Sequence, residues 1–382
     1  MKRTGILAFC SGLLILALGA RASWAPAKRL TWTAGGSSYP AIAVDPSDNL
    51  HVVWEDDTSG NSEVYYKKST DGGATWAGNQ RLTWTAGDSQ RPAIAVDSGG
   101  TLHVVWTDHT PGNPKIYYKK SSTGGDNWSG SQTLTWTGGA AGSPAIAVDS
   151  SDNLHVSWYA FTLEGIDIFY KKSTNGGAGW TPRQRLTWNS GYSQDPDLAV
   201  SSSTNIHVVW EDNVPGYSDI YYRKSGDGGA SWSTVRRLTW TAGSSISAVL
   251  AVAPSGALHV FWADDTPGND EIYAKRSTNG GANWTANQRL TWISGDSIGP
   301  AAAVGSSGNL HLFWADYISG SYDICYKKST NGGANWSTIQ RLTWNSGYSS
   351  YPAVAVDSSG GLHLVWQDVT PGNSEIYYRK GS

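Results

Sequence analysis

Arg-Leu-Thr-Trp occupies residues 29–32 and recurs at a fixed interval along the chain. Later copies of the motif begin at Arg81, Arg185, Arg237, Arg289 and Arg341, and Thr133 heads a variant copy. Each copy starts 52 residues after the one before it. Self-similarity with a period of this length is typical of repeat architectures, in which each repeat is one supersecondary unit. The sequence therefore describes one unit copied seven times.

Each copy contains four short segments, which in the first copy are 40–45, 50–56, 63–68 and 76–84. They are rich in Val, Ile, Tyr and Trp, alternate in part, and are separated by Gly, Asn, Asp, Ser and Pro, as strands and turns are. No helical periodicity is present. Four-stranded units of this size are typical of propeller blades. We predict an all-β chain, a seven-bladed β-propeller of four-stranded antiparallel blades.

The two ends of the chain complement each other. The last copy stops at Ser382, before its fourth segment, whereas residues 23–32 contain a fourth segment with no blade of its own. Trp24 precedes Arg29 by five residues, the same spacing that separates Trp76 from Arg81. We therefore predict a propeller over residues 23–382, closed into a ring by the N-terminal strand completing the last blade.

Residues 1–22 are typical of a secretory signal peptide. Lys2 and Arg3 precede an apolar run over 5–18, and Ala20-Arg-Ala22 forms a small-x-small cleavage site. We expect a secreted protein, extracellular or periplasmic. The run is short for a membrane span, so no transmembrane anchor is expected. Cys325 is then the only cysteine left, which excludes an intramolecular disulfide and a cysteine metal cluster.

The composition excludes other classes of protein. Aromatic residues make up 12% of the chain, with 21 Trp, and charged residues 15%, so the chain is not disordered for want of hydrophobicity. The net charge is −3, and becomes −6 when the signal peptide takes three basic residues with it. That balance is unlike the footprint of a nucleic-acid-binding protein. We expect a monomer without a cofactor.

The turn after each third segment carries a family resemblance. Residues 69–76 and 225–232 fit the pattern Ser-x-Asp-x-Gly-x-x-Trp, Asn replaces Asp at Asn175, Asn279 and Asn331, and one copy has Thr123. The pattern resembles the Asp box of bacterial-neuraminidase-repeat propellers, the sialidase-like superfamily. The resemblance implies a propeller over the whole mature chain, and a structural role for the box away from the active face.

Sialidase activity would further require an arginine triad, a Tyr–Glu pair and an acid/base Asp. The arginines of the Arg-Leu-Thr-Trp motifs are repeat features, and no Arg-Ile-Pro-type motif occurs near the start. These gaps favour a binding protein over a sialidase, and the enzyme stays open as the alternative.

Most of the abundant polar and aromatic residues are repeat features. Seven His share one position in the second segment, from His51 to His363, so they are expected to form structural hydrogen bonds. Most Trp should pack between blades, although those ending the second and fourth segments could expose a face for a sugar. Acidic pairs such as Asp56 and Glu63 should order the hairpins, with Ca²⁺ binding as the lesser alternative.

Departures from the repeat point to a site. Just before the first segment the copies differ, and copy three changes the hairpin between its second and third segments. In an antiparallel blade these positions share one face, where binding loops are expected. An arginine there could bind paired oxygens, carboxylates could accept hydroxyl hydrogens, and a tyrosine could stack on a sugar. The candidate ligand-binding residues are Tyr39, Arg91, Tyr159, Glu164, Asp195 and Tyr351.

Three functions remain open. The first is a non-catalytic, lectin-like module that recognises an extracellular glycan, because near-identical blades would add their weak sites through multivalency. The second is a sialidase-like glycoside hydrolase or a lyase with one site near blades 2–4, which would need two carboxylates roughly 5–9 Å apart. The third is a scaffold that binds a surface protein. Neutral drift among the copies is the alternative explanation of the departures.

Overall fold

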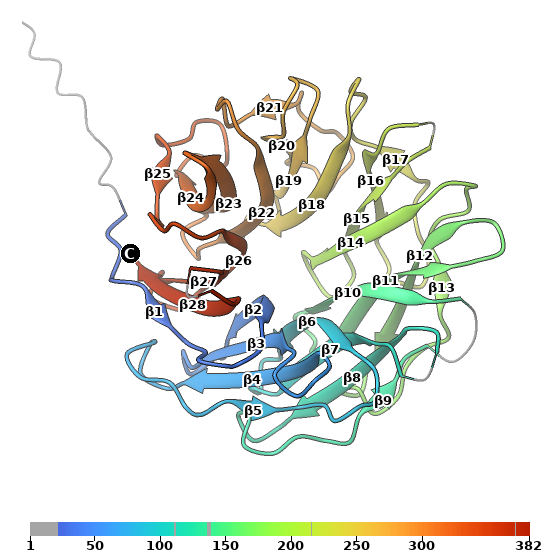
Figure 1. The fold of residues 1–382 in the computed structure, drawn as a ribbon. Coiled ribbons are helices and arrows are strands. Elements are labelled where there is room, and N and C mark those ends of the chain that lie inside the picture. Colours follow the sequence, from blue (N-terminus) through green and yellow to red (C-terminus); the bar gives the residue numbers. More distant parts are fainter. Residues whose placement is uncertain (1–21, 111, 136–138, 215, 371) are drawn as a thin grey trace, which may run out of the picture.

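Seven four-stranded antiparallel sheets form a ring (Figure 1) in a computed structural model. The structure describes residues 22–110, 112–135, 139–214, 216–370 and 372–382. Within these ranges all regular elements are strands. The predicted signal peptide lies outside the described residues except for Ala22. The seven-bladed propeller predicted from the repeats is confirmed.

Each blade runs from an inner strand at the channel to an outer strand at the circumference. The inner strands are β2 (Ser37–Val44), β6 (Ser89–Val96), β10 (Ala141–Val148), β14 (Ser193–Val200), β18 (Ser245–Val252), β22 (Ser297–Val304) and β26 (Ser349–Val356). The second strands are β3 (Leu50–Asp56), β7 (Leu102–Asp108), β11 (Leu154–Phe161), β15 (Ile206–Asp212), β19 (Leu258–Asp264), β23 (Leu310–Ile318) and β27 (Leu362–Asp368).

The third strands continue the meander outward. They are β4 (Glu63–Ser69), β8 (Lys115–Ser121), β12 (Ile166–Ser173), β16 (Asp219–Ser225), β20 (Glu271–Ser277), β24 (Ser321–Ser329) and β28 (Glu375–Gly381). The outer strands, two residues each, are β5 (Gln80–Arg81), β9 (Gln132–Thr133), β13 (Gln184–Arg185), β17 (Arg236–Arg237), β21 (Gln288–Arg289), β25 (Gln340–Arg341) and β1 (Lys28–Arg29). We number the blades 1 to 7 from β2 to β26.

The chain ends close the ring as predicted. The last sheet has the order β1-β28-β27-β26, so the N-terminal strand is the outer strand of blade 7 (Figure 1). Trp24 bridges to Gly381, and its ring lies edge-on to Phe313 and Tyr326 of blade 6, with centroids 5.7 and 5.4 Å away. Closure leaves no terminal blade with an uncovered face.

The core lies between neighbouring blades. Every residue of β3 is buried, because both faces of this strand are covered, which explains why its apolar run does not alternate strictly. One cluster joins Val53 and Tyr66 of blade 1 to Leu102 and Trp106 of blade 2. The strand-two tryptophans are at most 1% exposed, so the expectation that some could expose a face is wrong for them.

The repeated histidines are structural, as expected. His51 Nδ1 lies 2.8 Å from the Tyr66 hydroxyl, and Nε2 lies 3.3 Å from Asp45 Oδ2. Burial lowers the pKa of His51 below its usual value, which favours the neutral ring. The same His–Tyr bond, at 2.7–2.8 Å, recurs in blades 2, 3, 4, 6 and 7.

The turns with the Ser-x-Asp-x-Gly pattern are held by their own side chains. Asp71 accepts hydrogen bonds from the Thr75 N–H at 2.8 Å and the Ser69 hydroxyl at 2.8 Å. Hydrogen bonds from Thr75 hold the pKa of Asp71 at about 2. Asn175 accepts the equivalent bond from the Gly179 N–H, so an amide can take the place of the carboxylate.

Candidate functional site

A β-bulge at the start of every inner strand turns one side chain toward the channel. In blade 1 the register shifts between Ser38 and Ala41, and Tyr39 between them has φ of 49°. Arg91, Asp195 and Tyr351 have the same left-handed backbone, with φ of 46–50°. Bulges re-aim side chains next to binding sites, and a non-glycine residue with positive φ costs free energy that the surrounding sheet must offset.

The seven bulge residues ring a cavity of about 430 Å³ at the mouth of the central channel. We call this space the channel mouth. In blade order its bulge residues are Tyr39, Arg91, Ser143, Asp195, Ser247, Gly299 and Tyr351. Large or charged side chains come from blades 7, 1, 2 and 4, whereas blades 5 and 6 contribute only a hydroxymethyl group and a hydrogen. The free space therefore lies toward blades 5 and 6, facing a polar and aromatic wall.

Two hydrogen-bonded groups form that wall, and a cation–π contact joins them. Arg91 Nη1 donates to Asp195 Oδ1 at 3.2 Å and to Ser143 Oγ at 2.9 Å, and Ser143 donates to the same carboxylate oxygen at 2.6 Å. The guanidinium carbon of Arg91 lies 5.2 Å from the centre of the Tyr39 ring. Tyr39 in turn donates to the Tyr351 hydroxyl at 3.1 Å, and burial raises its pKa to about 12.

The structure brings four of the six predicted site residues together in the channel mouth. Tyr159, on β11, lies behind the mouth among Leu198 and Trp210, near enough for the charge of Asp195 to add to burial in raising its pKa. Glu164 lies elsewhere, at the tip of the blade-3 hairpin, where it accepts a hydrogen bond from Arg185 at 2.8 Å. It lines a separate cavity of about 680 Å³.

Two further carboxyl groups were missed. Glu211 lies beside Asp195, and burial together with the charge of Asp195 raises its pKa to about 7. Its position repeats as Glu55, which accepts the Arg91 N–H at 2.8 Å, so it resembled a plain repeat residue. Asp197 also lines the mouth and accepts the Leu250 N–H at 2.7 Å; burial raises its pKa to about 6. Its signal was an aspartate where other copies have Ala or Val.

Glu211→Gln should stabilise the protein at alkaline pH. The carboxyl group titrates near 7 in the fold and near 4.5 when unfolded, so folded-state stability falls as pH rises from about 4.5 to about 7. An amide avoids that loss, and we expect a gain of about 1–3 kcal/mol at pH 8 and little at pH 5. Urea midpoints at both pH values measure it. Glu55→Gln, facing Arg91 instead, is the control; an equal gain there would contradict the role of Asp195.

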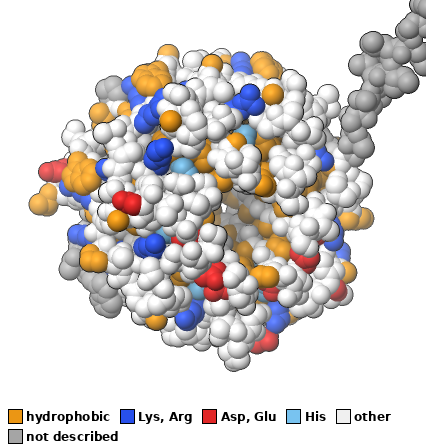
Figure 2. Space-filling model, turned by 180° about the vertical axis from the view of Figure 1, so that it is seen from behind, with side chains coloured by type: hydrophobic (Ala, Val, Ile, Leu, Met, Phe, Trp, Pro, Cys, Tyr) orange, Lys and Arg blue, Asp and Glu red, His pale blue; other side chains and the backbone are white. Residues whose placement is uncertain are grey.

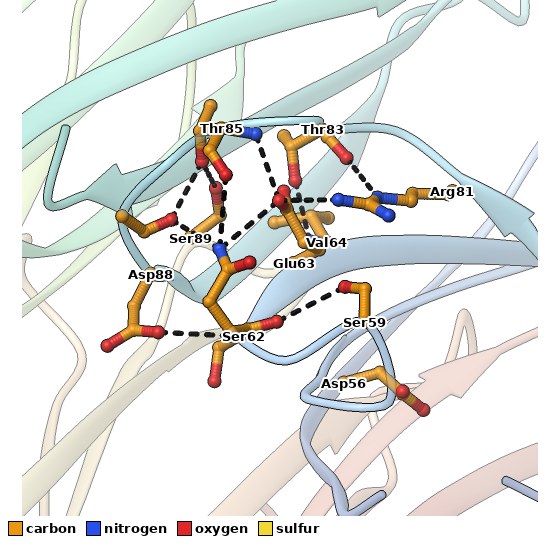
Figure 3. Close-up of polar contacts among 12 residues, drawn as sticks. Asp56, Ser59, Ser62, Glu63, Val64, Arg81, Thr83, Thr85, Asp88 and Ser89 are labelled. Carbon is orange, nitrogen blue, oxygen red and sulfur yellow. Dashed lines mark hydrogen bonds and ion pairs between the residues drawn. The ribbon is translucent and has the colours of Figure 1, made fainter. Parts of the chain in front are cut away.

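The acidic pairs order the hairpins, as expected. Figure 3 shows Glu63 Oε1 accepting hydrogen bonds from Arg81 Nη2 at 2.7 Å and from the Thr85 N–H at 2.9 Å. Asp56, across the hairpin, accepts one from the Ser37 hydroxyl at 2.6 Å. Among the described residues, no three His, Cys, Asp or Glu side chains are placed to hold a metal ion.

A second feature recurs around the circumference. The tryptophans three residues beyond the outer strands have exposed fractions of 62–69%, and they are Trp32, Trp84, Trp188, Trp240, Trp292 and Trp344. We call them the rim tryptophans; Trp136 of the same series lies outside the described residues. In five blades the arginine three residues before the tryptophan packs beside the indole, as Arg29 does at 5.7 Å from the Trp32 ring. Trp32 borders an inter-blade groove of about 420 Å³ with Lys67 and Trp76.

Figure 2 shows the molecule from behind the view of Figure 1. The ring is hollowed at its centre, and Lys and Arg are interspersed with Asp and Glu on the face that is seen. The described part of the chain contains no helix with the length and hydropathy needed to cross a membrane.

Comparison with known proteins supports the fold through solved structures alone. No protein-family model and no curated protein matches the chain. An ulvan lyase of polysaccharide lyase family PL25 superposes with a TM-score of 0.67 at 11% identity, covering 91% of this chain and 94% of that one. The chain has the fold of sialidase-like propellers. The intramolecular trans-sialidase from Ruminococcus gnavus matches with a TM-score of 0.55 at 14% identity, covering 92% and 96%.

A protein of unknown function from Dyadobacter fermentans also matches, with a TM-score of 0.60 at 12% identity, covering 93% of this chain and 99% of that one. At such identities the likeness concerns the fold.

Proposed function

We propose that this protein is a secreted, lectin-like propeller that binds a glycan on the face carrying the channel mouth and the rim tryptophans. The observation that carries this proposal is the exposed indole at the same position of the six blades in which the structure describes it. Burial explains why the strand-two tryptophan never changes between copies. It does not explain an unchanged rim tryptophan, because the residue beside it varies from Thr33 to Asn189 and Ile293.

Isolated indoles favour a saccharide over a protein partner. Each rim tryptophan is separated from the next by a whole blade and is bordered by charged groups such as Arg29 and Lys67. A stable protein interface needs a continuous patch of about 800 Å² per partner. A sugar ring needs one flat aromatic face and a few hydrogen-bonding groups at its edge.

The channel mouth suits a more specific contact. Arg91 offers N–H donors, Asp195 and Ser143 offer acceptors, and the rings of Tyr39 and Tyr351 lie 4.3 Å apart between centroids at an angle of 43°. Arg91 and Asp195 are 49% and 40% exposed, so a ligand can reach both. The free space beside them accommodates one or two sugar units, and we propose that the end of a glycan chain binds there.

A glycoside hydrolase or lyase is the second candidate. It is favoured by the pair of Asp195 and Glu211, in which the raised pKa of Glu211 gives a group able to hold and release a proton near neutral pH. The lyase and trans-sialidase that share the fold add to this candidate. Glycosidases need two carboxyl groups roughly 5–9 Å apart that both reach the substrate, whereas Glu211 is only 6% exposed, so binding without turnover is the better-supported function.

A glycan array probed with the mature protein tests the proposal. We expect saccharide binding without release of reducing or unsaturated ends, and a loss of about tenfold or more in Arg91→Ala, because that change removes a charged donor. Asp71→Asn, on the opposite face and mimicking Asn175, should bind as wild type does. Turnover that disappears in Asp195→Asn would favour the enzyme, and capture of a protein without any glycan response would favour a scaffold.

We further propose that residues 1–22 are removed during export. The mature chain should begin at Ser23, whose carbonyl accepts a hydrogen bond from the Ser382 N–H at 3.0 Å. N-terminal mass spectrometry of secreted protein would detect this start.

A further inference from the structure

Blade 5 lacks a side chain that the other six blades share. At the position of Tyr66 in blade 1, blade 5 has Ala274. The acidic or hydroxyl partner of the histidine is also missing there, because Ala253 stands where blade 1 has Asp45. Blade 5 nevertheless retains the histidine, His259, which is 3% exposed.

In the other blades the tyrosine fills a slot between two blades. Tyr222 of blade 4 places its hydroxyl 2.8 Å from His207 Nδ1 and its ring edge-on to Trp284 of the next blade, at 5.1 Å between centroids. The hydroxyl also reaches the glycine turn of that blade. A Cβ added at Gly281 would lie only 2.0 Å from the Tyr222 hydroxyl oxygen.

In blade 5 that slot is open. A cavity of about 350 Å³ lies there, bordered by His259, Phe261 and Ala274 of blade 5 and by Gly333 and Trp336 of blade 6. A Cβ added at Gly333 would meet no hydroxyl, and its second-nearest atom would be His259 Nδ1 at 3.5 Å. Phe261 takes over the edge contact with Trp336, at 5.7 Å, without reaching the histidine with a polar atom.

The imidazole in this cavity is a neutral group without its usual partners. His259 Nε2, the nitrogen that meets Asp45 in blade 1, is buried with no hydrogen-bond partner, although buried polar atoms in folded proteins are almost always paired. Nδ1, the nitrogen that meets the tyrosine hydroxyl in the other blades, faces the open slot. Burial, with a smaller contribution from Arg276, lowers the pKa of His259 to about 4. At neutral pH one ring nitrogen is therefore an acceptor and the other a donor.

We propose that this cavity is a binding site for a small phenol, a single aromatic ring bearing a hydroxyl group that hydrogen-bonds to His259. The slot suits a tyrosine side chain, because the equivalent slots of the other six blades each hold a tyrosine. The Trp336 ring offers the aromatic edge-to-face contact, and Arg276 and Gln288 border the opening. This site lies between blades, away from the channel mouth, and does not depend on the proposed glycan function.

Water filling the slot would leave its apolar walls, from Phe261, Ala274 and Trp336, hydrated. Apolar cavities in folded proteins take up benzene-like ligands, and the apolar part of this lining offers the same kind of surface. The histidine adds a preference for a hydroxyl group, which a plain hydrocarbon ring does not satisfy.

Calorimetric and ligand-observed NMR titration of the mature chain with 4-methylphenol, the tyrosine side-chain analogue, tests the proposal. We expect one site per chain, and affinity about three- to tenfold above that of toluene, the value of one neutral hydrogen bond. In His259→Phe the two ligands should bind equally. In Ala274→Tyr the slot is filled by the chain itself, and binding should fall at least tenfold.

Tyr222→Ala is the matched gain-of-site control, because it opens the same slot in blade 4 and should add a second site. Three results would overturn the proposal: no binding of 4-methylphenol to wild type, binding unchanged in Ala274→Tyr, or equal affinities for 4-methylphenol and toluene in wild type. Glycan binding through Arg91 would survive each of these results, so the two proposals fail separately.

Discussion

Replacing the six rim tryptophans by alanine is expected to lower retention of the protein on an immobilised polysaccharide it binds by a factor of ~10²–10⁴. The replaced residues are Trp32, Trp84, Trp188, Trp240, Trp292 and Trp344. Trp136 remains, so the variant keeps at most one site of this kind. The loss is large because weak equivalent sites on one rigid ring engage the same polymer together, and a single remaining site has no such advantage.

The fold should survive this change. The six indoles are 62–69% exposed, so their removal costs little buried apolar surface, and surface substitutions away from special features usually change stability by less than about 0.5 kcal/mol. The measurement is surface plasmon resonance on the immobilised polysaccharide, with thermal unfolding to check the fold.

Two variants separate stacking from other contributions. Trp84→Ala alone should weaken binding only a few-fold. Replacing all six rim tryptophans by tyrosine keeps an aromatic face at each position and should preserve most of the retention. If the variant with all six tryptophans replaced by alanine is folded and binds the polymer as well as wild type, the rim tryptophans have no part in recognition. Binding of single-stranded oligonucleotides through the same indoles would point to base stacking instead.

The blades and the ring closure could be predicted from sequence because each depends on spacing alone. A 52-residue period gives equivalent positions the same environment, so His51 and Tyr66 meet in blade 1 as His103 and Tyr118 do in blade 2. The offset of Trp24 from Arg29 then identifies the strand that completes blade 7.

The site was predicted only in part, for physical reasons. The bulge residues, such as Arg91 and Asp195, occupy the same position in every blade. Residues that differ between copies at this position therefore all lie at the channel mouth. Glu164 departs from the repeat at a hairpin tip, whose direction sequence does not fix, and it lies beside Arg185. Glu211 repeats in blade 1 as Glu55, and only its contact with Asp195 distinguishes it.

A side chain that is missing from one copy is harder to recognise in the sequence than one that is replaced by a distinctive residue. Ala274 and Ala253 read as ordinary small residues in a strand and at its end. Their meaning depends on His259 between them, whose partners in the other blades are known only once the slot geometry is seen.

Removing residues 23–31 is expected to abolish a stable monomeric fold. The shortened chain lacks β1 and leaves β28 as an open sheet edge, which favours pairing with another chain. It also lacks Leu30, which is 2% exposed, and losing a buried leucine side chain costs about 2–5 kcal/mol.

The larger cost is electrostatic. Arg29 Nη2 lies 2.5 Å from Glu375 Oε1, and the Glu375 side chain is fully buried. Removing one partner of a buried ion pair costs about 3–5 kcal/mol, because the other charge stays buried and unpaired. Together with Leu30, this approaches the 5–15 kcal/mol that holds an ordinary protein folded.

Size-exclusion chromatography and thermal unfolding of the shortened chain measure the effect, and a synthetic peptide of residues 23–32 should restore the monomer. Arg81→Ala is the control for the ion pair alone, because Arg81 and Glu63 make the same contact, at 2.7 Å, inside one blade. It should destabilise without opening the ring or causing association. A shortened chain that stays monomeric and melts as wild type does would mean that blade 7 is stable with three strands. Packing between blades, rather than the pairing of β1 with β28, would then hold the ring closed.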